Sequence, residues 1–496
     1  MESGRVHCTV VLSSRENFVW HSMQEIIPAI ERAWLGSADP GSHQVLCLDI
    51  DSLRLGEILP TLLKADTIVQ TCFTYKMCRL GLLLRQRFQI DARWIIHLHN
   101  QATIACWPFH FWGMGEHLNA DDVFISSCTR DAETMSLSFN NARAAVIPFT
   151  HPEQERANQD KQACKPQEPI PLVFIGRISA QKNLHTLLYA LRLWLDSARP
   201  KRQVHLNLYG QEDHLGSPNM KMESRDYGNV LRDLVNILKL GPHVSFHGHV
   251  PRDELYARLS GQKQIFVSAS LHSDENFGMA AFRALCDGNL AVLSEWGGHA
   301  DFAKTFPEQV FFCMPLHSAS GPVICARELA GSIDRAVDRY PRMTTPLFPE
   351  AYREHVVSAR LRELAFLPQT PKLTLQMTEV AARILETRRK FAAENPASTQ
   401  IFSSYSDPSA HSFFSYYGAK EPVRKTALAR HRLFLVPWAR ITETGAILAS
   451  DPHRGRILLK EALGGETCTV VDIFGKEHNM STTAAQEALE SGLLHD

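Results

Sequence analysis

The sequence predicts an α/β protein with two doubly wound, Rossmann-like domains and a small C-terminal αβ extension. Three observations support this prediction. The 496 residues exceed the roughly 250–300 at which a single hydrophobic core stops growing. In both halves, short apolar runs alternate with longer amphipathic ones, which is typical of strands and helices in parallel sheets. A polar stretch with three prolines, at residues 151–169, separates the halves and is expected to be a linker.

The first domain is predicted over residues 1–150. Its apolar runs have the length of buried strands, and the stretches between them have the period of amphipathic helices. The expected strands are residues 6–12, 44–50, 67–72, 94–99, 123–126 and 145–148. The expected helices include residues 19–33, 75–87 and 129–138. The repeated order of strand and helix implies a mostly parallel sheet covered on both faces.

The second domain is predicted over residues 170–340, where the alternation resumes. The expected strands are residues 172–175, 204–209, 244–248, 265–268 and 291–294, and the expected helices include residues 184–195, 230–240 and 279–286. Residues 341–420 are less regular and are expected to be helical or irregular, with one long amphipathic helix at 374–393. Residues 421–496 are expected to form a small appended αβ unit.

Composition excludes several classes of protein. Lys and Arg total 52 against 53 Asp and Glu, so no positive field favours a nucleic acid partner. No uninterrupted apolar stretch reaches the ~18 residues of a membrane-spanning helix. The 11 cysteines are scattered without a CxxC pair, which favours a reducing, cytoplasmic setting. The 23 histidines show no HExxH pattern or other metal-ligand spacing, so no metal and no cofactor is expected.

The first chemical motif lies at residues 174–183, where a predicted strand gives way to a helix. Gly176 allows close approach of a ligand to the backbone, and the helix N-terminus offers free N–H groups. Arg177 and Lys182 add two cations, a combination that suits a diphosphate. The alternative is a glycine turn with two solvated basic residues.

The second motif, at residues 270–279, follows another buried strand. Its carboxylates stand where open α/β sheets bind ligands, and Glu275 is a candidate to hold the hydroxyl groups of a sugar. The alternative is an acidic N-cap for the helix that begins at Met279. A third loop, at residues 294–301, contains the glycine pair Gly297 and Gly298. All three loops follow parallel strands, so they are expected at one edge of the sheet.

These three loops resemble those of retaining GT-B glycosyltransferases of family 4. The donor-phosphate motif of that family is matched by Gly176, Arg177, Lys182 and Asn183. The start of its E-x7-E motif is matched by Glu275, Asn276, Phe277 and Gly278. Its Gly-x-x-Glu loop is matched from Gly298 to Asp301. The resemblance is strong over residues 170–305, moderate over 90–150, and weak or absent beyond residue 340.

The resemblance implies a hexosyltransferase that needs no metal and transfers sugar from a nucleotide-sugar donor with retention of anomeric configuration. It implies that the second domain binds the donor, through residues 176–301, and that the first domain binds the acceptor, through residues 10–130. It also implies that Arg177 and Lys182 stabilise the departing diphosphate and that Glu275 holds the sugar. The base of the donor is left open, as is the acceptor, which is a saccharide, a lipid-linked molecule or a protein. One position departs from the pattern, because the second glutamate of E-x7-E is replaced by Arg283. That glutamate contacts the donor ribose in the family, so the replacement puts this contact in doubt.

In the first domain, the resemblance places His99, with His97 second, near the donor sugar and the acceptor. A histidine there can orient hydroxyl groups or share a proton, and the alternative is a histidine that caps the strand. The aromatic loop at residues 107–115 is open to three interpretations: stacking on an acceptor sugar, peripheral contact with a membrane surface, or packing on its own domain.

Two rival functions remain at this stage. One is a non-catalytic nucleotide-sugar-binding or regulatory protein, in which Arg283 has altered the site. The other is an inverting transferase or an epimerase built on the same paired fold, which product stereochemistry would distinguish.

Overall fold

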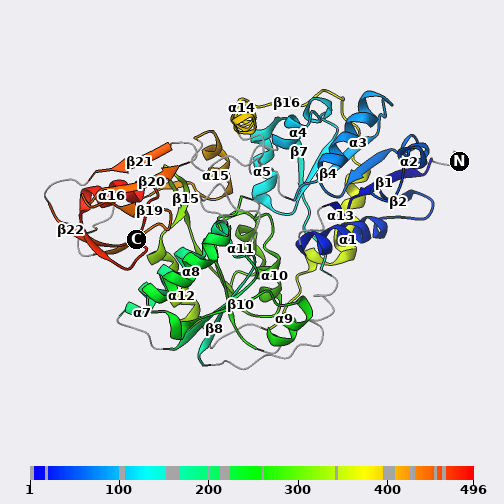
Figure 1. Cartoon of the computed structure of the whole chain (residues 1–496). Coiled ribbons are helices and arrows are strands. Elements are labelled where there is room, and N and C mark those ends of the chain that lie inside the picture. Colours follow the sequence, from blue (N-terminus) through cyan, green and yellow to red (C-terminus); the bar gives the residue numbers. More distant parts are fainter. Residues whose placement is uncertain are drawn as a thin grey trace. The chain divides into compact units, whose positions relative to one another are not determined.

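The computed structural model divides the chain into two compact units (Figure 1). Unit 1 comprises Met1–Asp160 and Phe348–Arg389, and unit 2 comprises Lys161–Leu347 and Lys390–Asp496. The structure describes residues 5–16, 21–99, 107–151, 168–197, 202–212, 224–259, 262–273, 275–340, 345–394, 408–423, 428, 431–451, 455–460 and 465–496. Most of the predicted linker at 151–169 lies outside these residues.

Unit 1 contains a six-stranded parallel sheet in the order β2-β1-β3-β4-β5-β7. Its strands are β1 (His7–Ser13), β2 (His43–Asp49), β3 (Thr67–Gln70), β4 (Arg93–His97), β5 (Val123–Ser126) and β7 (Arg143–Val146). The three strands β3, β4 and β5 are buried at every position. Their continuous apolar runs therefore reflect a sheet covered on both faces.

The helices of unit 1 come from both of its chain segments. They are α1 (His21–Gly36), α2 (Leu55–Leu62), α3 (Tyr75–Gln86), α4 (Trp107–Phe111), α5 (Thr129–Ser138), α13 (Glu354–Ala365) and most of α14 (Glu379–Glu394). The returning segment is bound closely: Nη1 of Arg93, on β4, donates to the carbonyl of Leu367 at 2.7 Å. A short antiparallel pair, β6 (Phe139–Asn140) with β16 (Gln376–Met377), joins the two segments again. The sequence analysis predicts residues 341–420 as a single helical or irregular region. In the structure, residues 348–389 belong to unit 1 and the residues after 389 belong to unit 2.

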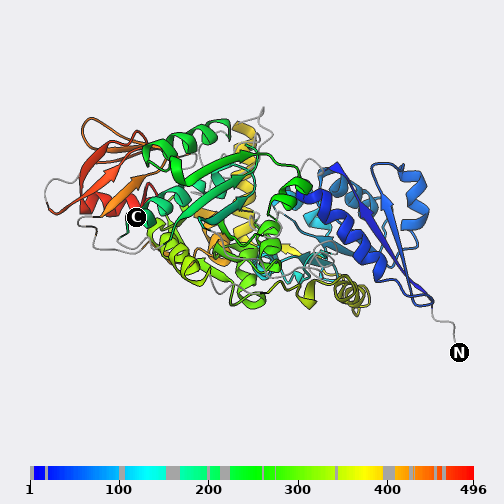
Figure 2. The ribbon, with the colours of Figure 1, turned by 90° about the horizontal axis from the view of Figure 1, so that it is seen from below.

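Unit 2 contains a second six-stranded parallel sheet, in the order β10-β9-β8-β11-β12-β13. Its strands are β8 (Ile170–Ile175), β9 (Val204–Tyr209), β10 (Val244–Gly248), β11 (Ile265–Ser268), β12 (Leu290–Ser294) and β13 (Val310–Cys313). Its helices include α7 (Leu184–Asp196), α8 (Ser224–Ile237), α9 (Arg252–Leu259), α10 (Met279–Cys286), α11 (Phe302–Thr305) and α12 (Ala326–Arg339). Figure 2 shows helices on both sides of this sheet. Both sheets are doubly wound, so the predicted fold class is confirmed.

The C-terminal module of unit 2 is a small αβ structure, as predicted. A four-stranded sheet is formed by β18 (Arg432–Leu435), β22 (Thr467–Val471), β23 (Glu477–Ser481) and β24 (Leu494–His495). A three-stranded sheet is formed by β19 (Ala439–Ile441), β20 (Ile447–Asp451) and β21 (Gly455–Leu459), and α16 (Thr482–Glu490) completes the module. Phe434 of β18 stacks on Tyr189 of α7, with ring centroids 4.6 Å apart. The module therefore shares the hydrophobic core of unit 2.

Another three-stranded sheet links the main sheet of unit 2 to this module. It contains β14 (Pro315–Ser318), β15 (Gly321–Ile324) and β17 (Glu421–Pro422). The short helix α15 (His411–Tyr417) precedes β17 along the chain. This helix belongs to unit 2, and its Tyr417 packs against Trp296, which follows β12.

Candidate active site

The candidate site lies at the carboxyl edge of the unit 2 sheet. In the order β10-β9-β8-β11-β12-β13, the direction of winding reverses between β8 and β11, and open α/β sheets bind ligands in the crevice at such a point. Gly176 and Arg177 follow β8, and residues 270–275 follow β11. Two of the three predicted loops therefore flank the reversal, and the third follows the adjacent strand β12.

Glu275 is the centre of this site. Its Oε2 atom accepts a hydrogen bond from Nζ of Lys182 at 2.5 Å and another from Oγ of Ser270 at 2.5 Å. Its Oε1 atom lies 3.8 Å from Nε2 of His299, in the third loop. The carboxylate thus connects the three loops. Sequence reasoning identified Lys182 and Glu275 but not Ser270 or His299.

The electrostatic environment keeps Glu275 ionised. Burial is the largest single influence and would raise the pKa of this carboxyl, but the Lys182 ammonium, His299, His272 and the hydrogen bond from Lys182 together outweigh burial. The net effect holds the pKa of Glu275 well below its usual value. A carboxylate that stays charged can accept hydrogen bonds from a ligand's hydroxyl groups across the physiological pH range.

The guanidinium of Arg177 pairs with a histidine. Its Nη2 atom lies 2.9 Å from Nε2 of His272. A guanidinium can only donate, so Nε2 of His272 accepts and the imidazole is neutral. Burial lowers the pKa of His272 well below its ordinary value, and the charges of Lys182 and Arg177 lower it further. His272 thus orients the guanidinium without neutralising its charge.

Glycine is required where the second and third loops meet. The N–H of Gly298 donates to the carbonyl of Glu275 at 2.7 Å. A Cβ atom at Gly298 would lie 2.4 Å from the carbonyl oxygen of Asn276, and one at Gly297 would lie 2.3 Å from that of Glu275. Gly278 has a φ of +83°, and a Cβ there would lie 2.6 Å from the His299 ring. The glycines therefore allow the backbone contact that fixes Glu275.

Aromatic side chains support the third loop from behind. Trp296 donates from Nε1 to the carbonyl of His272 at 2.7 Å. Its ring packs edge to face on Tyr417 of α15, with centroids 5.0 Å apart. No local sequence signal relates these two residues, which are far apart in the chain.

The remaining predicted site residues in unit 2 have structural contacts. Asn183 adopts a left-handed conformation, with φ of 57°, and its side chain accepts a hydrogen bond from Thr186 at 2.6 Å. Phe277 is buried against Phe282 at a centroid distance of 5.2 Å. Asp301 ends a short 3-10 turn, Gly297–Asp301, before α11. The roles of Gly176, Asn276 and Asp301 stay predictions.

Arg283 replaces the second glutamate of the resembled motif and packs on an aromatic ring. The Cζ atom of Arg283, on α10, lies 5.4 Å from the ring centroid of Tyr256, on α9. Arg252 lies over the same ring at 5.5 Å. The position thus presents a guanidinium, which donates hydrogen bonds, where the family presents a carboxylate, which accepts them.

His99 belongs to unit 1, at the carboxyl edge of β4. Its Nε2 atom donates to the carbonyl of Thr71 at 2.6 Å. Burial lowers the pKa of His99 to about 4, so the ring is neutral near pH 7. Its neighbour His97 accepts from Nε1 of Trp34 at 3.0 Å, and its pKa is also lowered well below the ordinary value by burial.

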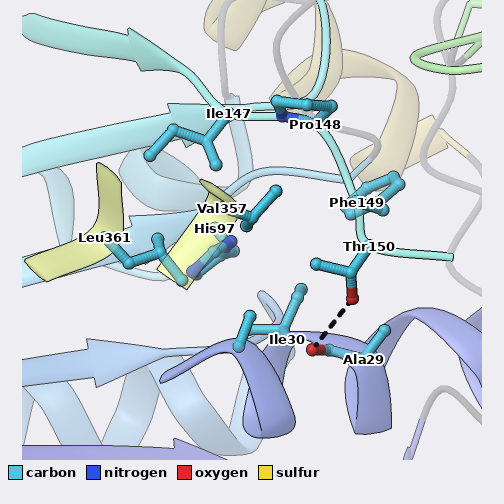
Figure 3. A pocket seen from close by; sticks show the side chains of 10 residues that line it. Ala29, Ile30, His97, Ile147, Pro148, Phe149, Thr150, Val357 and Leu361 are labelled. Carbon is cyan, nitrogen blue, oxygen red and sulfur yellow. Dashed lines mark hydrogen bonds between the residues drawn. The ribbon is translucent and has the colours of Figure 1, made fainter. Parts of the chain in front are cut away.

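His97 also lines a small cavity between α1, α13 and residues 147–150 (Figure 3). The internal volume is about 10 Å³, which is near the least that one water molecule needs. The lining is mostly apolar and includes Ile30, Val357 and Leu361. This cavity is too small for a sugar.

The aromatic loop of unit 1 packs largely on its own unit. Phe109 is fully buried and lies 3.8 Å, centroid to centroid, from Phe73. Trp112 stacks on Phe73 at 5.4 Å, whereas Phe111 is partly exposed. The side chains of Trp107 and Pro108 lie outside the described residues.

The described part of the chain contains neither a metal-binding cluster nor a membrane-spanning helix. No group of three or more His, Cys, Asp or Glu side chains there has a metal-binding arrangement. No helix there is both long enough and apolar enough to cross a membrane.

One comparison with known proteins matches the part of the chain that contains these three loops. Residues 155–312 match the family model described as glycosyl transferases group 1. No curated protein matches the chain. Among solved structures, the lipopolysaccharide outer core galactosyltransferase WaaB is 12% identical, with a TM-score of 0.48 over 72% of this chain and 99% of that one.

Two further structures are similar at the same level. Anabaena HepE, solved with UDP and glucose, is 14% identical, with a TM-score of 0.41 over 78% of this chain and 100% of that one. An E. coli trehalose-6-phosphate protein, solved with UDP-2-fluoro glucose, is 13% identical, with a TM-score of 0.47 over 78% of this chain and 98% of that one. The ligands are properties of those two proteins.

Proposed function

We propose that the protein is a glycosyltransferase that moves a hexose-type sugar from a nucleotide-sugar donor bound at the carboxyl edge of the unit 2 sheet. One observation carries the proposal. Two cations and a buried, ionised carboxylate meet at the topological reversal of a sheet that lies largely within residues 155–312, the region that matches the group 1 model.

The donor diphosphate is assigned to Arg177 and Lys182. Both cations follow the backbone turn that begins at Gly176. The ammonium of Lys182 has three N–H donors, so it can donate to a phosphate oxygen as well as to Glu275. His272 holds the Arg177 guanidinium in place through its neutral ring. The same charges stabilise the leaving group as negative charge develops on it, so the assignment requires no metal.

The sugar is assigned to Glu275. Its carboxylate accepts hydrogen bonds from two protein donors, and the remaining lone pairs are suited to sugar hydroxyl groups. Asn276, Phe277, Gly278, Gly297, Gly298 and Asp301 form the surrounding loops. His99 of unit 1 is assigned to the hydroxyl groups of the donor sugar or the acceptor, with Nδ1 of its neutral ring as the acceptor, because Nε2 donates to the Thr71 carbonyl.

The reaction breaks the bond between the anomeric carbon and the diphosphate oxygen and forms a bond from that carbon to an acceptor oxygen. The acceptor hydroxyl's proton passes to the departing phosphate oxygen, so atoms and charges balance. Attack on the face that the diphosphate leaves gives retention of configuration, in line with the family 4 resemblance. The described cysteines are all free thiols, which favours a cytoplasmic setting for this reaction.

A second function is favoured by one observation, the packing of Arg283 on Tyr256. If this guanidinium excludes a productive donor, the protein is a nucleotide-sugar-binding protein without turnover. Binding would then saturate with no release of nucleotide.

Nucleotide release tests the proposal. Purified protein is incubated with UDP-, GDP-, ADP- and dTDP-hexoses and CMP-sugars in the presence of EDTA, and free nucleotide is measured over time. Release from one nucleotide class, by transfer or slow hydrolysis, is the expected result. Saturable binding without release would support the binding protein, and inverted product by proton NMR would overturn the retaining assignment.

A further inference from the structure

The third loop of unit 2 places a buried histidine beside the carboxylate that is assigned to the sugar. His299 lies in the 3-10 turn Gly297–Asp301, and only 2% of its side chain is exposed. Its Nε2 atom lies 3.8 Å from Oε1 of Glu275, which is too far for a hydrogen bond. In the proposed transfer Glu275 binds the sugar, and His299 has no part.

The two carboxylate oxygens of Glu275 have different surroundings. Oε2 accepts hydrogen bonds from Lys182 and Ser270, each at 2.5 Å. Oε1 accepts none from any residue that the structure describes, and His299 is its near neighbour. Because protein donors occupy Oε2, Oε1 is the oxygen that is open to a hydroxyl group of a ligand. A change in the surroundings of Oε1 therefore changes how the sugar is bound.

The His299 ring is held in place by the second loop and by α11. A Cβ atom at Gly278 would lie 2.6 Å from Cδ2 and 2.8 Å from Nε2 of this ring. The ring centroid also lies 6.3 Å from that of Phe302, which packs in turn on Phe282 at 6.2 Å. These contacts keep the imidazole beside Glu275, so a change in their separation comes mainly from rotation of the carboxylate.

The charge of His299 depends on pH in a range that its neighbours do not share. Burial has the largest influence and lowers the pKa of His299; the Glu275 carboxylate raises it, Lys182 lowers it and the Ser294 backbone raises it. The net pKa lies below the ordinary value, so the ring is neutral near pH 7. The pKa values of His272 and Glu275 are both held well below their ordinary values. His299 is therefore expected to gain a proton before either of them as the pH falls.

We propose that His299 is a positioning residue for Glu275 and makes recognition of the donor sugar sensitive to pH. The inference rests on the proposed glycosyl transfer and adds a control of its sugar-binding carboxylate. The neutral ring leaves Oε1 to accept from a sugar hydroxyl group. An imidazolium has N–H groups on both nitrogens, so protonated His299 donates to Oε1 and competes with that hydroxyl group. Binding of the sugar weakens, while the diphosphate contacts of Arg177 and Lys182 are kept.

Titration of the histidine rings by NMR tests the pairing without any ligand. In protein labelled with ¹³C in its histidine rings, the curve that is missing from His299→Leu belongs to His299. Its midpoint is expected between about pH 5 and pH 6.5. In Glu275→Gln the midpoint is expected to shift to lower pH, because the carboxylate stabilises the imidazolium. A midpoint below this range, or one that does not move in Glu275→Gln, would overturn the proposal.

Calorimetric titration tests the effect on the donor. The probes are UDP-, GDP-, ADP- and dTDP-glucose and the four free diphosphates, between about pH 5 and pH 8. Below the His299 midpoint, the affinity of wild type for the conjugate that binds is expected to fall by up to about tenfold per pH unit. In His299→Leu and His299→Gln, which cannot titrate, it is expected to change by no more than about twofold. His243→Gln, in the 3-10 turn η6 (Gly241–His243) that precedes β10, is the matched control and is expected to follow wild type.

The free diphosphates separate the two proposals. Their affinity for wild type relative to His299→Leu is expected to be the same at every pH. If conjugates and diphosphates bind, but wild type and both His299 variants share one pH dependence, the role of His299 is overturned and the donor site stands. The role is also overturned if the pH dependence persists in His299→Leu and disappears in His272→Leu. If neither kind of probe binds, the donor site fails and this role fails with it, while the NMR curves still show whether His299 and Glu275 are paired.

Discussion

The Nζ atom of Lys182 lies 2.5 Å from Oε2 of Glu275, although the two residues follow different strands of the unit 2 sheet. Both side chains are largely buried, with 16% and 11% exposed. In the proposed site the two residues bind different parts of the donor. The Lys182 cation binds the diphosphate, and the Glu275 carboxylate binds the sugar hydroxyl groups. Variants that alter one member at a time therefore separate the two tasks.

Glu275→Gln is expected to reduce turnover about 100-fold and to change the affinity for the free nucleoside diphosphate by no more than about threefold. The amide keeps the shape of the side chain but loses the charge that binds hydroxyl groups. Steady-state kinetics and calorimetric titration measure the two quantities. Glu308→Gln, at an exposed carboxylate of the same unit, is the control. Equal losses of turnover and diphosphate affinity would contradict the division of tasks.

Gly298→Ala is expected to destabilise unit 2 by about 2 kcal/mol and to abolish donor binding. The new methyl group would meet the backbone of Asn276, which cannot move without displacing Glu275. Gly241→Ala is the matched control, because a Cβ there meets no atom within 4 Å, and it is expected to change stability by no more than about 0.5 kcal/mol. Urea denaturation measures both variants. The tight loop packing would be disproved if the two variants behaved alike.

The stability of unit 1 is expected to fall as the pH drops below 6.5. Burial lowers the pKa of His99 to about 4, whereas an unfolded histidine titrates near 6.5. Between these values the unfolded chain binds the proton that the native ring excludes, so acid favours unfolding. His99 alone contributes a loss of about 2 kcal/mol between pH 6.5 and pH 5. In His99→Asn the unfolding free energy is expected to change less with pH, and identical pH dependence in the two proteins would contradict the assignment.

Phe434→Ala is expected to destabilise unit 2 by about 3–5 kcal/mol. The ring stacks on Tyr189 and belongs to the core that the C-terminal module shares with the main sheet. Phe474→Ala, which removes a ring that is 79% exposed, is expected to change stability by less than about 0.5 kcal/mol. Thermal unfolding compares the two. A single small effect for both variants would show that the module is an independent appendage.

The strands and several helices could be predicted from the sequence because their signals are local. The predicted helix 129–138 and strand 204–209 coincide with α5 and β9. The return of Phe348–Arg389 to unit 1 could not be predicted, because it depends on contacts such as that of Arg93 with Leu367, 274 residues apart. Hydrophobic periodicity contains no information about such pairs.

The candidate site divides in the same way. Its position at strand ends could be predicted, because glycine, basic and acidic residues after apolar runs are visible in the sequence. The partners that fix each group could not. The bond from Arg177 to His272 and the support of Trp296 by Tyr417 depend on how separate loops fold together.

The most direct test of the donor site is calorimetric titration of UDP, GDP, ADP, CDP and dTDP into wild type, Lys182→Ala and Lys420→Ala. Lys420 is an exposed lysine of unit 2 and serves as the control. Wild type and Lys420→Ala are expected to bind one of these diphosphates, and Lys182→Ala is expected to bind it about 10–100-fold more weakly, as the loss of a charge-assisted hydrogen bond implies. If no diphosphate binds wild type, or if Lys182→Ala binds as tightly as Lys420→Ala, the carboxyl edge of unit 2 is not the donor site.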